Sequence, residues 1–327
     1  MKSRNFLRIV IFIVGLFLIG QLVGRQFVRW SRADINYSIT HSEFVAMQDK
    51  VWMVVLGDSH PQKGVKTPDI PGAYTLATSS ESYPFTYYIM KYYLEEMDFH
   101  PKVAVLTIDP NGFISSRMNG IKRRDPAFWD FYVNYLEIDA TTEEFADYLP
   151  TIVEAKLSFL GGWDVTMNQL WPLESQVSDY QELGFISLES RMSDMAEWKI
   201  RQDGIARADK HFDGKYLDEA LVTYFLKLID LLQAHDVDVV LVWYPMSDGY
   251  YEGMNQYLSG EEHLSKVEEL LGDRQVDLIL DYHDFFFGQP EYFADPDHLN
   301  KWGAAIFTED LYANLIEAGL VPPEGMP

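Results

Sequence analysis

The stretch VWMVVLGDSH, residues 51–60, decides the fold. Its first six residues are apolar and include three valines, which predicts a short strand buried on both faces. Gly57 ends this strand, and Ser59 follows in the turn. The carboxyl ends of parallel strands border the crevice in which open α/β sheets bind their ligands. A serine at this position is therefore a candidate nucleophile.

Working outward from this stretch, the same kinds of pattern recur. Apolar runs at residues 102–108, 237–244 and 276–280 predict three more strands. Amphipathic stretches at residues 82–97, 217–235 and 301–318 predict helices. Strands that alternate with helices are typical of an α/β fold around a parallel sheet.

Residues 113–215 interrupt this alternation. They are rich in aromatic and helix-forming acidic residues, and they contain no convincing strand. We interpret this stretch as a helical insertion that lies over one face of the sheet, either as a cap or as additional core.

The N-terminus differs in charge from the rest of the chain. Residues 1–33 hold six basic residues and no acidic one, so residues 34–327 carry 20 − 50 = −30. Residues 9–24 are apolar except for Gln21 and would span about 24 Å as a helix. Flanking arginines can extend such a span towards the headgroups. We expect residues 1–33 to form a cytoplasmic stub and a signal-anchor transmembrane helix.

This topology gives a single-pass protein of the cytoplasmic membrane with its N-terminus inside. Residues 34–327 then form one extracytoplasmic domain, either periplasmic or extracellular. A cleaved signal peptide is the alternative, although no small-x-small cleavage site follows the apolar run.

Composition excludes several classes of function. Among its 327 residues the chain has no cysteine, which rules out a thiolate zinc site, an iron–sulfur cluster and a cysteine nucleophile. The formal net charge of −24 argues against nucleic acid as a partner, because phosphates require a basic surface.

A serine nucleophile needs a base and an acid that orients the base. The loop Asp295-Pro-Asp-His298 can supply both, because an acid three residues before a histidine can turn back to its Nδ1 atom. We predict Ser59 as nucleophile, His298 as base and Asp295 as the orienting acid. Four readings stay open: Ser59 as a plain turn residue, His298 as a packed loop histidine, Asp297 as the histidine's partner, and His60 as a residue that shapes the turn.

These residues resemble the SGNH, or GDSL-like, hydrolase superfamily. Ser59 matches the superfamily's block I serine, and Asp295 with His298 matches its block V Asp-x-x-His. The run at residues 295–303 looks most like the membrane-anchored extracytoplasmic branch, which includes alginate O-acetyltransferase proteins and DltD-type proteins. The resemblance covers residues 51–112 and 237–316 and implies a three-layer α/β/α, flavodoxin-like fold.

Two parts of the superfamily's pattern, the block II glycine and the block III Gly-x-Asn-Asp, are absent in their usual form. Residues 78–80, Thr-Ser-Ser, stand where block II is expected, and residues 109–112, Asp-Pro-Asn-Gly, where block III is expected. By this resemblance Ser79 and Asn111 are carried over as oxyanion donors, beside the backbone N–H of Ser59.

The resemblance implies a membrane-anchored serine O-acyltransferase. It would move acetyl, or a similar acyl group, to a cell-envelope or secreted polysaccharide through an acyl-enzyme, with a membrane-bound O-acyltransferase as the partner on the donor side. No cofactor is implied. An extracytoplasmic carbohydrate esterase with the same triad, or a non-catalytic membrane-tethered assembly or glycan-binding protein, remains the alternative.

A metal site is the other chemistry to weigh. Residues 58–60, Asp-Ser-His, also match the Asp-x-His opening of a metallophosphoesterase. Such a site needs a following Gly-Asp-x-x-Asp and a Gly-Asn-His-Asp/Glu, and the sequence has neither. We therefore predict no metal.

Overall fold

The computed structural model describes residues 8–20, 36–117 and 181–321. The chain divides into two compact units, residues 1–39 with 122–176 and residues 40–121 with 177–327. Most of the predicted insertion, residues 118–180, and residues 21–24 of the predicted membrane span lie outside the described residues.

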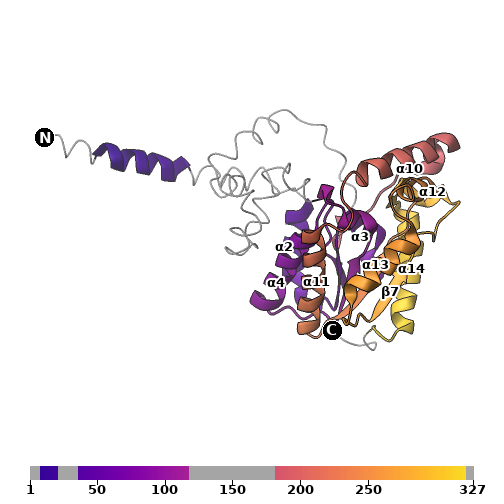
Figure 1. Ribbon diagram of the computed structural model, residues 1–327. Helices are drawn as coiled ribbons and strands as arrows, with labels where there is room; N and C mark the ends of the chain where they lie inside the picture. Colours follow the sequence, from indigo (N-terminus) through magenta and orange to yellow (C-terminus); the bar gives the residue numbers. More distant parts are fainter. Residues whose placement is uncertain (1–7, 21–35, 118–180, 322–327) are drawn as a thin grey trace. The chain divides into compact units, whose positions relative to one another are not determined.

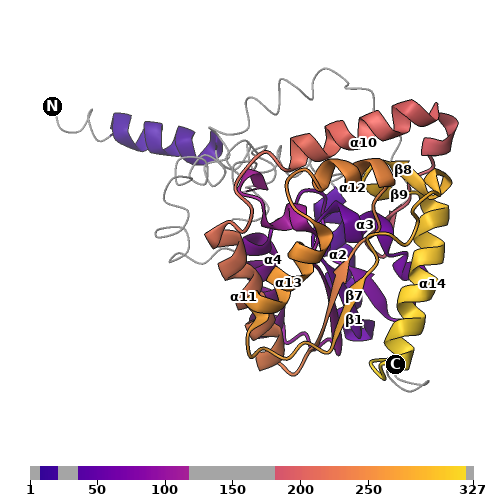
Figure 2. The same cartoon turned by 45° about the vertical axis from the view of Figure 1, so that its right-hand side comes forward.

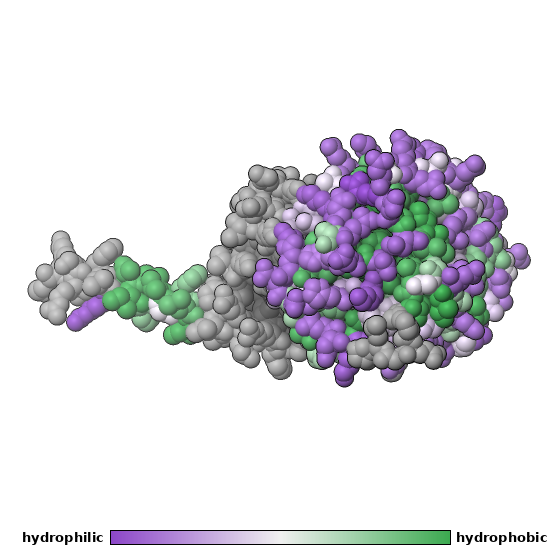
Figure 3. Space-filling view, turned by 90° about the horizontal axis from the view of Figure 1, so that it is seen from below, coloured by the Kyte–Doolittle hydropathy of each residue, from purple (hydrophilic) through white to green (hydrophobic). Residues whose placement is uncertain are grey.

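In the first unit, residues 8–20 form a helix. Its large apolar side chains are exposed, as the green surface of this helix in Figure 3 shows. Among the residues that the structure describes, no helix combines the length and the apolarity needed to cross a membrane.

The second unit is built on a five-stranded parallel sheet. Its strands are β1 (Met53–Leu56), β2 (Ala73–Thr75), β3 (Val103–Thr107), β6 (Asp238–Trp243) and β7 (Leu278–Asp281). They lie in the order β2-β1-β3-β6-β7, and every pairing is parallel. Counted along the chain this is the order 2-1-3-4-5 of flavodoxin-like sheets. The predicted α/β fold around a parallel sheet is confirmed.

Helices cover both faces of the sheet (Figure 1). One face carries α4 (Tyr83–Lys91), which continues as a π-helix (Tyr92–Glu96) and packs against α11 (Glu219–Ala234). The other face carries α3 (Ser59–Gly64) and α14 (Lys301–Glu317). Alternate residues of a strand face opposite sides, so Met53 and Val55 of β1 join Phe307 and Leu311 of α14 in one apolar core.

The remaining elements complete the unit at its edges and ends. The helices are α2 (Asn36–Met47), which belongs to this unit from Thr40 onward, α10 (Glu197–His211), α12 (Asp248–Met254) and α13 (Gly260–Leu271). Short 3-10 turns lie at η1 (Gln48–Lys50), η2 (Thr67–Asp69), η4 (Pro110–Phe113), η6 (Met192–Asp194) and η7 (Pro290–Tyr292). In Figure 2, α10 and α12 lie together at the top, close to the end of the sheet where α3 begins.

The four predicted strands and three predicted helices are confirmed, with ends within two residues of the expected ones. The expectation that residues 113–215 contain no strand is wrong. A small antiparallel hairpin forms from β4 (Gln181–Glu182) and β5 (Phe185–Ile186), turning at Leu183 and Gly184. Thr75 N–H donates to the carbonyl of Leu183, 2.9 Å away. Strands of two residues leave no periodic pattern in a sequence, which explains the error.

Gly57 gives a test of the close packing at the turn after β1. Its φ of +127° is rarely adopted by other residues, and a Cβ atom would lie 2.5 Å from Thr107 Cγ2. We expect Gly57→Ala to lower the free energy of unfolding in urea by about 1–3 kcal/mol, from backbone strain and overpacking.

The matched control is Gly272→Ala. Gly272 also has a positive φ, +56°, but its Cβ would meet no heavy atom within 4 Å. It should lose only the strain, about 1 kcal/mol. An equal loss in both variants would show that the turn after β1 has room for a side chain.

Candidate active site

Ser59 begins α3 directly after β1, at the carboxyl end of the sheet. Asp58 caps the helix, because its Oδ1 accepts a hydrogen bond of 3.0 Å from the N–H of His60. Arg117 forms an ion pair with the other oxygen of Asp58. The predicted strand, turn and candidate nucleophile are thus in place, and the cap fixes the direction in which Ser59 leaves the turn.

The structure brings His298 and Asp295 to Ser59, although His298 lies 239 positions away along the chain. They lie on a small antiparallel pair, β8 (Phe293–Asp295) and β9 (His298–Leu299). His298 Nε2 is 2.8 Å from Ser59 Oγ, and His298 Nδ1 is 2.9 and 2.8 Å from the two oxygens of Asp295. Because Nδ1 faces a carboxylate, we assign its proton there, which leaves Nε2 free to accept the serine hydroxyl.

Asn300 fixes this loop to the protein. It is fully buried and caps α14, with Oδ1 accepting from Trp302 N–H and Gly303 N–H at 3.1 Å each. Its Nδ2 donates to the carbonyls of Glu291 and Phe293, at 2.7 and 3.3 Å. Our sequence reasoning missed this role, although asparagine just before a helix is a strong cap signal.

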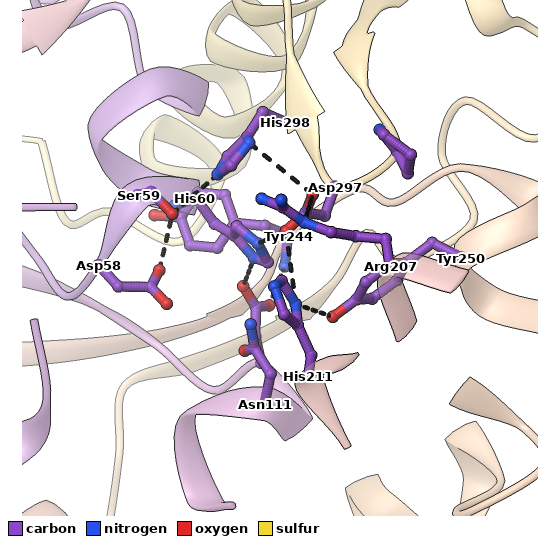
Figure 4. A network of polar contacts seen from close by, with 12 residues as sticks. Asp58, Ser59, His60, Asn111, Arg207, His211, Tyr244, Tyr250, Asp297 and His298 are labelled. Atoms are coloured by element: carbon purple, nitrogen blue, oxygen red, sulfur yellow. Dashed lines mark hydrogen bonds and ion pairs between the residues drawn. The ribbon is translucent and has the colours of Figure 1, made fainter. Parts of the chain in front are cut away.

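His60 bridges two buried carboxylates behind the serine (Figure 4). Its Nδ1 contacts Asp109, and its Nε2 lies 3.3 Å from Asp297 Oδ2. Asp109 also accepts the backbone N–H of Tyr244 at 2.8 Å. Burial lowers the pKa of His60, but the charges of Asp109 and Asp58 outweigh it and hold that pKa well above 6.5. His60 therefore joins Asp109 to Asp297 inside the protein and does more than shape the turn.

Asp297 is a second carboxylate beside His298. Its Oδ1 lies 2.9 Å from Arg207 Nε and 3.8 Å from His298 Nδ1, and its Oδ2 lies 3.6 Å from His211 Nδ1. Burial raises the pKa of Asp297, but the neighbouring His298 and His60 hold it well below its usual value. Asp295 is thus the hydrogen-bonded partner of His298, and Asp297 is a more distant charge.

Arg207 and His211 were not predicted as site residues. They stand four residues apart on α10, so both side chains leave the same face of the helix. Burial lowers the pKa of His211 to about 4, and its Nδ1 lies 2.8 Å from the Tyr250 hydroxyl. A basic pair four residues apart is the only signal that could have found them.

Consecutive hydrogen bonds now join a serine, a histidine and an aspartate at the carboxyl edge of a 2-1-3-4-5 sheet. The protein resembles SGNH or GDSL-like hydrolases. One similar solved structure is a proposed acylhydrolase from Bacteroides fragilis. The two structures match with a TM-score of 0.38 and 10% sequence identity, and the match covers 82% of this chain and 88% of that chain. Another is a GDSL-like lipase from Bacteroides thetaiotaomicron. This match has a TM-score of 0.41 and 10% sequence identity, and it covers 87% of this chain and 98% of that chain.

No protein-family model and no curated protein matches the chain. Because both TM-scores are below 0.5, the SGNH-type resemblance rests on the residues and their geometry. The roles of Ser59, His298 and Asp295 stay predictions, as does the membrane-anchored branch of the superfamily.

The two predicted SGNH-type oxyanion donors differ in their surroundings. Ser79 donates both its N–H and its hydroxyl to Gln62 Oε1, at 3.0 and 2.7 Å. Asn111, in η4 at the end of β3, is buried, and its amide has no hydrogen-bond partner among the described residues. Figure 4 places it beside the His60 network. Asn111 is thus able to donate as it stands, whereas Ser79 would first have to leave Gln62.

The same cluster has the composition of a metal site, but its members are paired with one another. His60, Asp297 and His298 lie close enough to share an ion, as do Asp58, His60 and Asp109. Arginine already pairs with Asp58 and with Asp297. The two ring nitrogens of His60 contact Asp109 and Asp297. Each of these groups is thus already paired within the protein, so they fit a metal ion poorly.

Two cavities among the described residues border the loop of Asp295 and His298. One, of about 710 Å³, is lined by Phe185, Arg191, Tyr292 and Trp302 among others. The other, of about 850 Å³, is lined by Trp198, Ser247, Glu252 and Phe293 among others. Neither is lined by Ser59 or His298, so neither is the place where an acyl group would meet the nucleophile.

Proposed function

We propose that the chain is a membrane-anchored serine O-acyltransferase of the SGNH type. It moves an acetyl or similar acyl group to a hydroxyl of a cell-envelope or secreted polysaccharide. The observation that carries this proposal is the 2.8 Å contact between Ser59 Oγ and His298 Nε2, on an imidazole whose Nδ1 faces Asp295. This is the arrangement that activates a serine for acyl transfer.

In the first half of the reaction, Ser59 Oγ attacks the ester carbonyl of the donor while its proton passes to His298 Nε2. The tetrahedral intermediate then breaks the bond to the leaving oxygen, which takes the proton back from Nε2. In the second half, His298 removes a proton from the acceptor hydroxyl, which attacks the acyl-serine. The proton returns to Ser59 Oγ as the new ester leaves.

The negative charge of each tetrahedral intermediate needs donors already in place. Ser59 is the first residue of α3, where the N–H groups lack helical partners and the helix dipole favours an anion. Asn111 Nδ2 is the second donor that we propose, because it is buried and has no other partner among the described residues. Ser79 is the third, after its release from Gln62.

The membrane and its partners enter through the N-terminus. The exposed apolar side chains of the helix at residues 8–20 suit a lipid environment, and residues 1–33 carry only basic charge. We propose that this segment tethers an extracytoplasmic domain. A membrane-bound O-acyltransferase would then supply the acyl group, as the resemblance implies.

One observation favours hydrolysis as the alternative outcome. The Asp295 side chain is 40% exposed although it contacts the base, so water reaches the edge of the site. An esterase differs only in the second half of the reaction, where water replaces the sugar hydroxyl.

The proposal is tested by intact-protein mass spectrometry of the full chain in detergent after incubation with p-nitrophenyl acetate. We expect one added acetyl group that maps to Ser59 and is absent from Ser59→Ala. Ser190→Ala, which removes an exposed serine, is the control and should keep the adduct. Faster loss of the adduct when a polysaccharide is added, with acetyl appearing on the glycan, separates transfer from hydrolysis. Folded protein that neither forms the adduct nor releases nitrophenol would contradict the proposal.

A further inference from the structure

Two carboxylates stand on the Nδ1 side of His298, and they differ in exposure. The side chain of Asp295 is 40% exposed and lies within hydrogen-bond distance of Nδ1. The side chain of Asp297 is 1% exposed, and its Oδ1 lies 3.8 Å from Nδ1. The nearer carboxylate is therefore wet and the more distant one is dry.

This difference matters because water weakens charge interactions. Two unit charges about 4 Å apart attract each other several-fold more strongly at the effective dielectric of a protein site than in bulk water. A half-exposed carboxylate can hold the orientation of the ring through its hydrogen bond, but solvent screens its charge. The buried charge of Asp297 is screened much less.

Asp297 is also held in place from several sides. His60 Nε2 lies 3.3 Å from Oδ2, and Arg207 Nε lies 2.9 Å from Oδ1. His60 is anchored in turn by Asp109. Removing a buried charge's partners is costly, so these contacts keep the Asp297 carboxylate fixed beside the histidine.

The groups that face this pair come from three helices and two loops. They are Asp58, His60 and Lys63 at α3, Arg207 and His211 on α10, and Tyr250 on α12. Asp109 and Arg117 pair with His60 and Asp58 one step further out. Asp297 is surrounded by both positive and negative groups. The charge near His298 can therefore be changed in two ways, by removing a negative charge or by removing a positive one.

We propose that Asp297 is a positioning residue for the SGNH-type reaction: its buried charge stabilises the imidazolium that His298 becomes when it takes the Ser59 proton. Asp295 fixes the orientation and tautomer of the ring. No proton moves to Asp297 at any step. This division of labour rests on the proposed function, since it requires His298 to act as the base.

The test compares the pH dependence of kcat/KM for p-nitrophenyl acetate in variants of the full chain. Asp297→Asn keeps the size of the side chain but removes the charge, so the protonated histidine loses support. We expect kcat to fall roughly 10- to 100-fold with little change in KM, and the acid limb of the profile to move to lower pH. Asp297→Glu restores the charge and should recover part of the rate.

Arg207→Gln removes a positive charge from the same cluster and should move the acid limb the opposite way, to higher pH. Arg201→Gln is the matched control. Arg201 stands on the same helix, is exposed and also pairs with a carboxylate, that of Glu252, yet it lies outside the site. We expect its profile to be that of the wild type.

The acid limbs of Asp297→Asn and Arg207→Gln should thus move in opposite directions, which a merely structural role would not produce. If the acid limb of each folded, active variant stays where it is in the wild type, the proposal for Asp297 is overturned. If Asp297→Asn does not fold, the limb of Arg207→Gln decides in the same way. Failure of the proposed function looks different, because Ser59→Ala would then keep its activity.

Discussion

Ser59→Ala and His298→Ala are each expected to slow the release of nitrophenol from p-nitrophenyl acetate by about 10³-fold or more. Ser59 Oγ forms the covalent bond, and His298 is the base 2.8 Å away, so removing either leaves only binding and oxyanion stabilisation. Asp295→Ala should lose activity on the same scale, because it is the group that sets the tautomer. The measurement is steady-state turnover by full-length protein.

Residues that act as one unit give non-additive losses, which sharpens this prediction. The double variant Ser59→Ala/His298→Ala should be no slower than either single variant, within a few-fold. Circular dichroism and urea unfolding check that the fold is retained, as expected where Asp58 still caps α3. Folded Ser59→Ala with wild-type turnover would sink the mechanism.

Acidification from pH 7 to pH 5 is expected to lower the free energy of unfolding by about 4–6 kcal/mol. Burial lowers the pKa of His41 to about 3, and those of His211 and His263 to about 4. Below pH 6.5, the pKa of histidine in the unfolded chain, these three side chains bind protons in the unfolded state but stay neutral in the folded state. Stability is therefore lost as pH falls from 6.5 towards about 4.

One histidine works against this trend. The pKa of His60 is raised, so its contribution is complete below the unfolded pKa and is lost as pH rises. It offsets the loss only in part, because the other three act together. The lowered pKa of Asp297 matters only below its unfolded value, outside this window.

Urea unfolding at several pH values measures this slope. His263→Gln should flatten it, since it removes a side chain buried between the Tyr216 hydroxyl and the Ile108 carbonyl. His100→Gln is the control, because that ring is 60% exposed, and it should leave the slope unchanged. Equal stability at pH 7 and pH 5 would contradict the prediction.

The central strands could be predicted from the sequence because they are buried on both faces and leave continuous apolar runs. The candidate triad could be found because its residues stand at the ends of such elements, where Asp-x-x-His and Gly-Asp-Ser carry chemical meaning. Strand β2 has only three residues and sits at the edge of the sheet, so no periodicity marks it. Its pairing becomes visible only beside β1.

The network of charges around His60 could not be predicted from the sequence, for a different reason. Asp109, Asp297 and Arg207 are joined through His60 and through space, not by any spacing along the chain. Arg207 comes from a stretch that we interpreted as a helical insertion, either a cap or additional core, and that carries no motif. A buried network of charges depends on which groups share a low dielectric, and only the packed fold determines that.

Asn300 has a consequence for the cost of each turnover. Its four hydrogen bonds join the loop of Asp295 and His298 to the first turn of α14, so the imidazole inherits the order of a 17-residue helix. A looser loop would have to lose conformational entropy each time it aligned the base with the nucleophile. Here that entropy is already lost when the chain folds. The entropy of alignment is thereby moved from the reaction to folding.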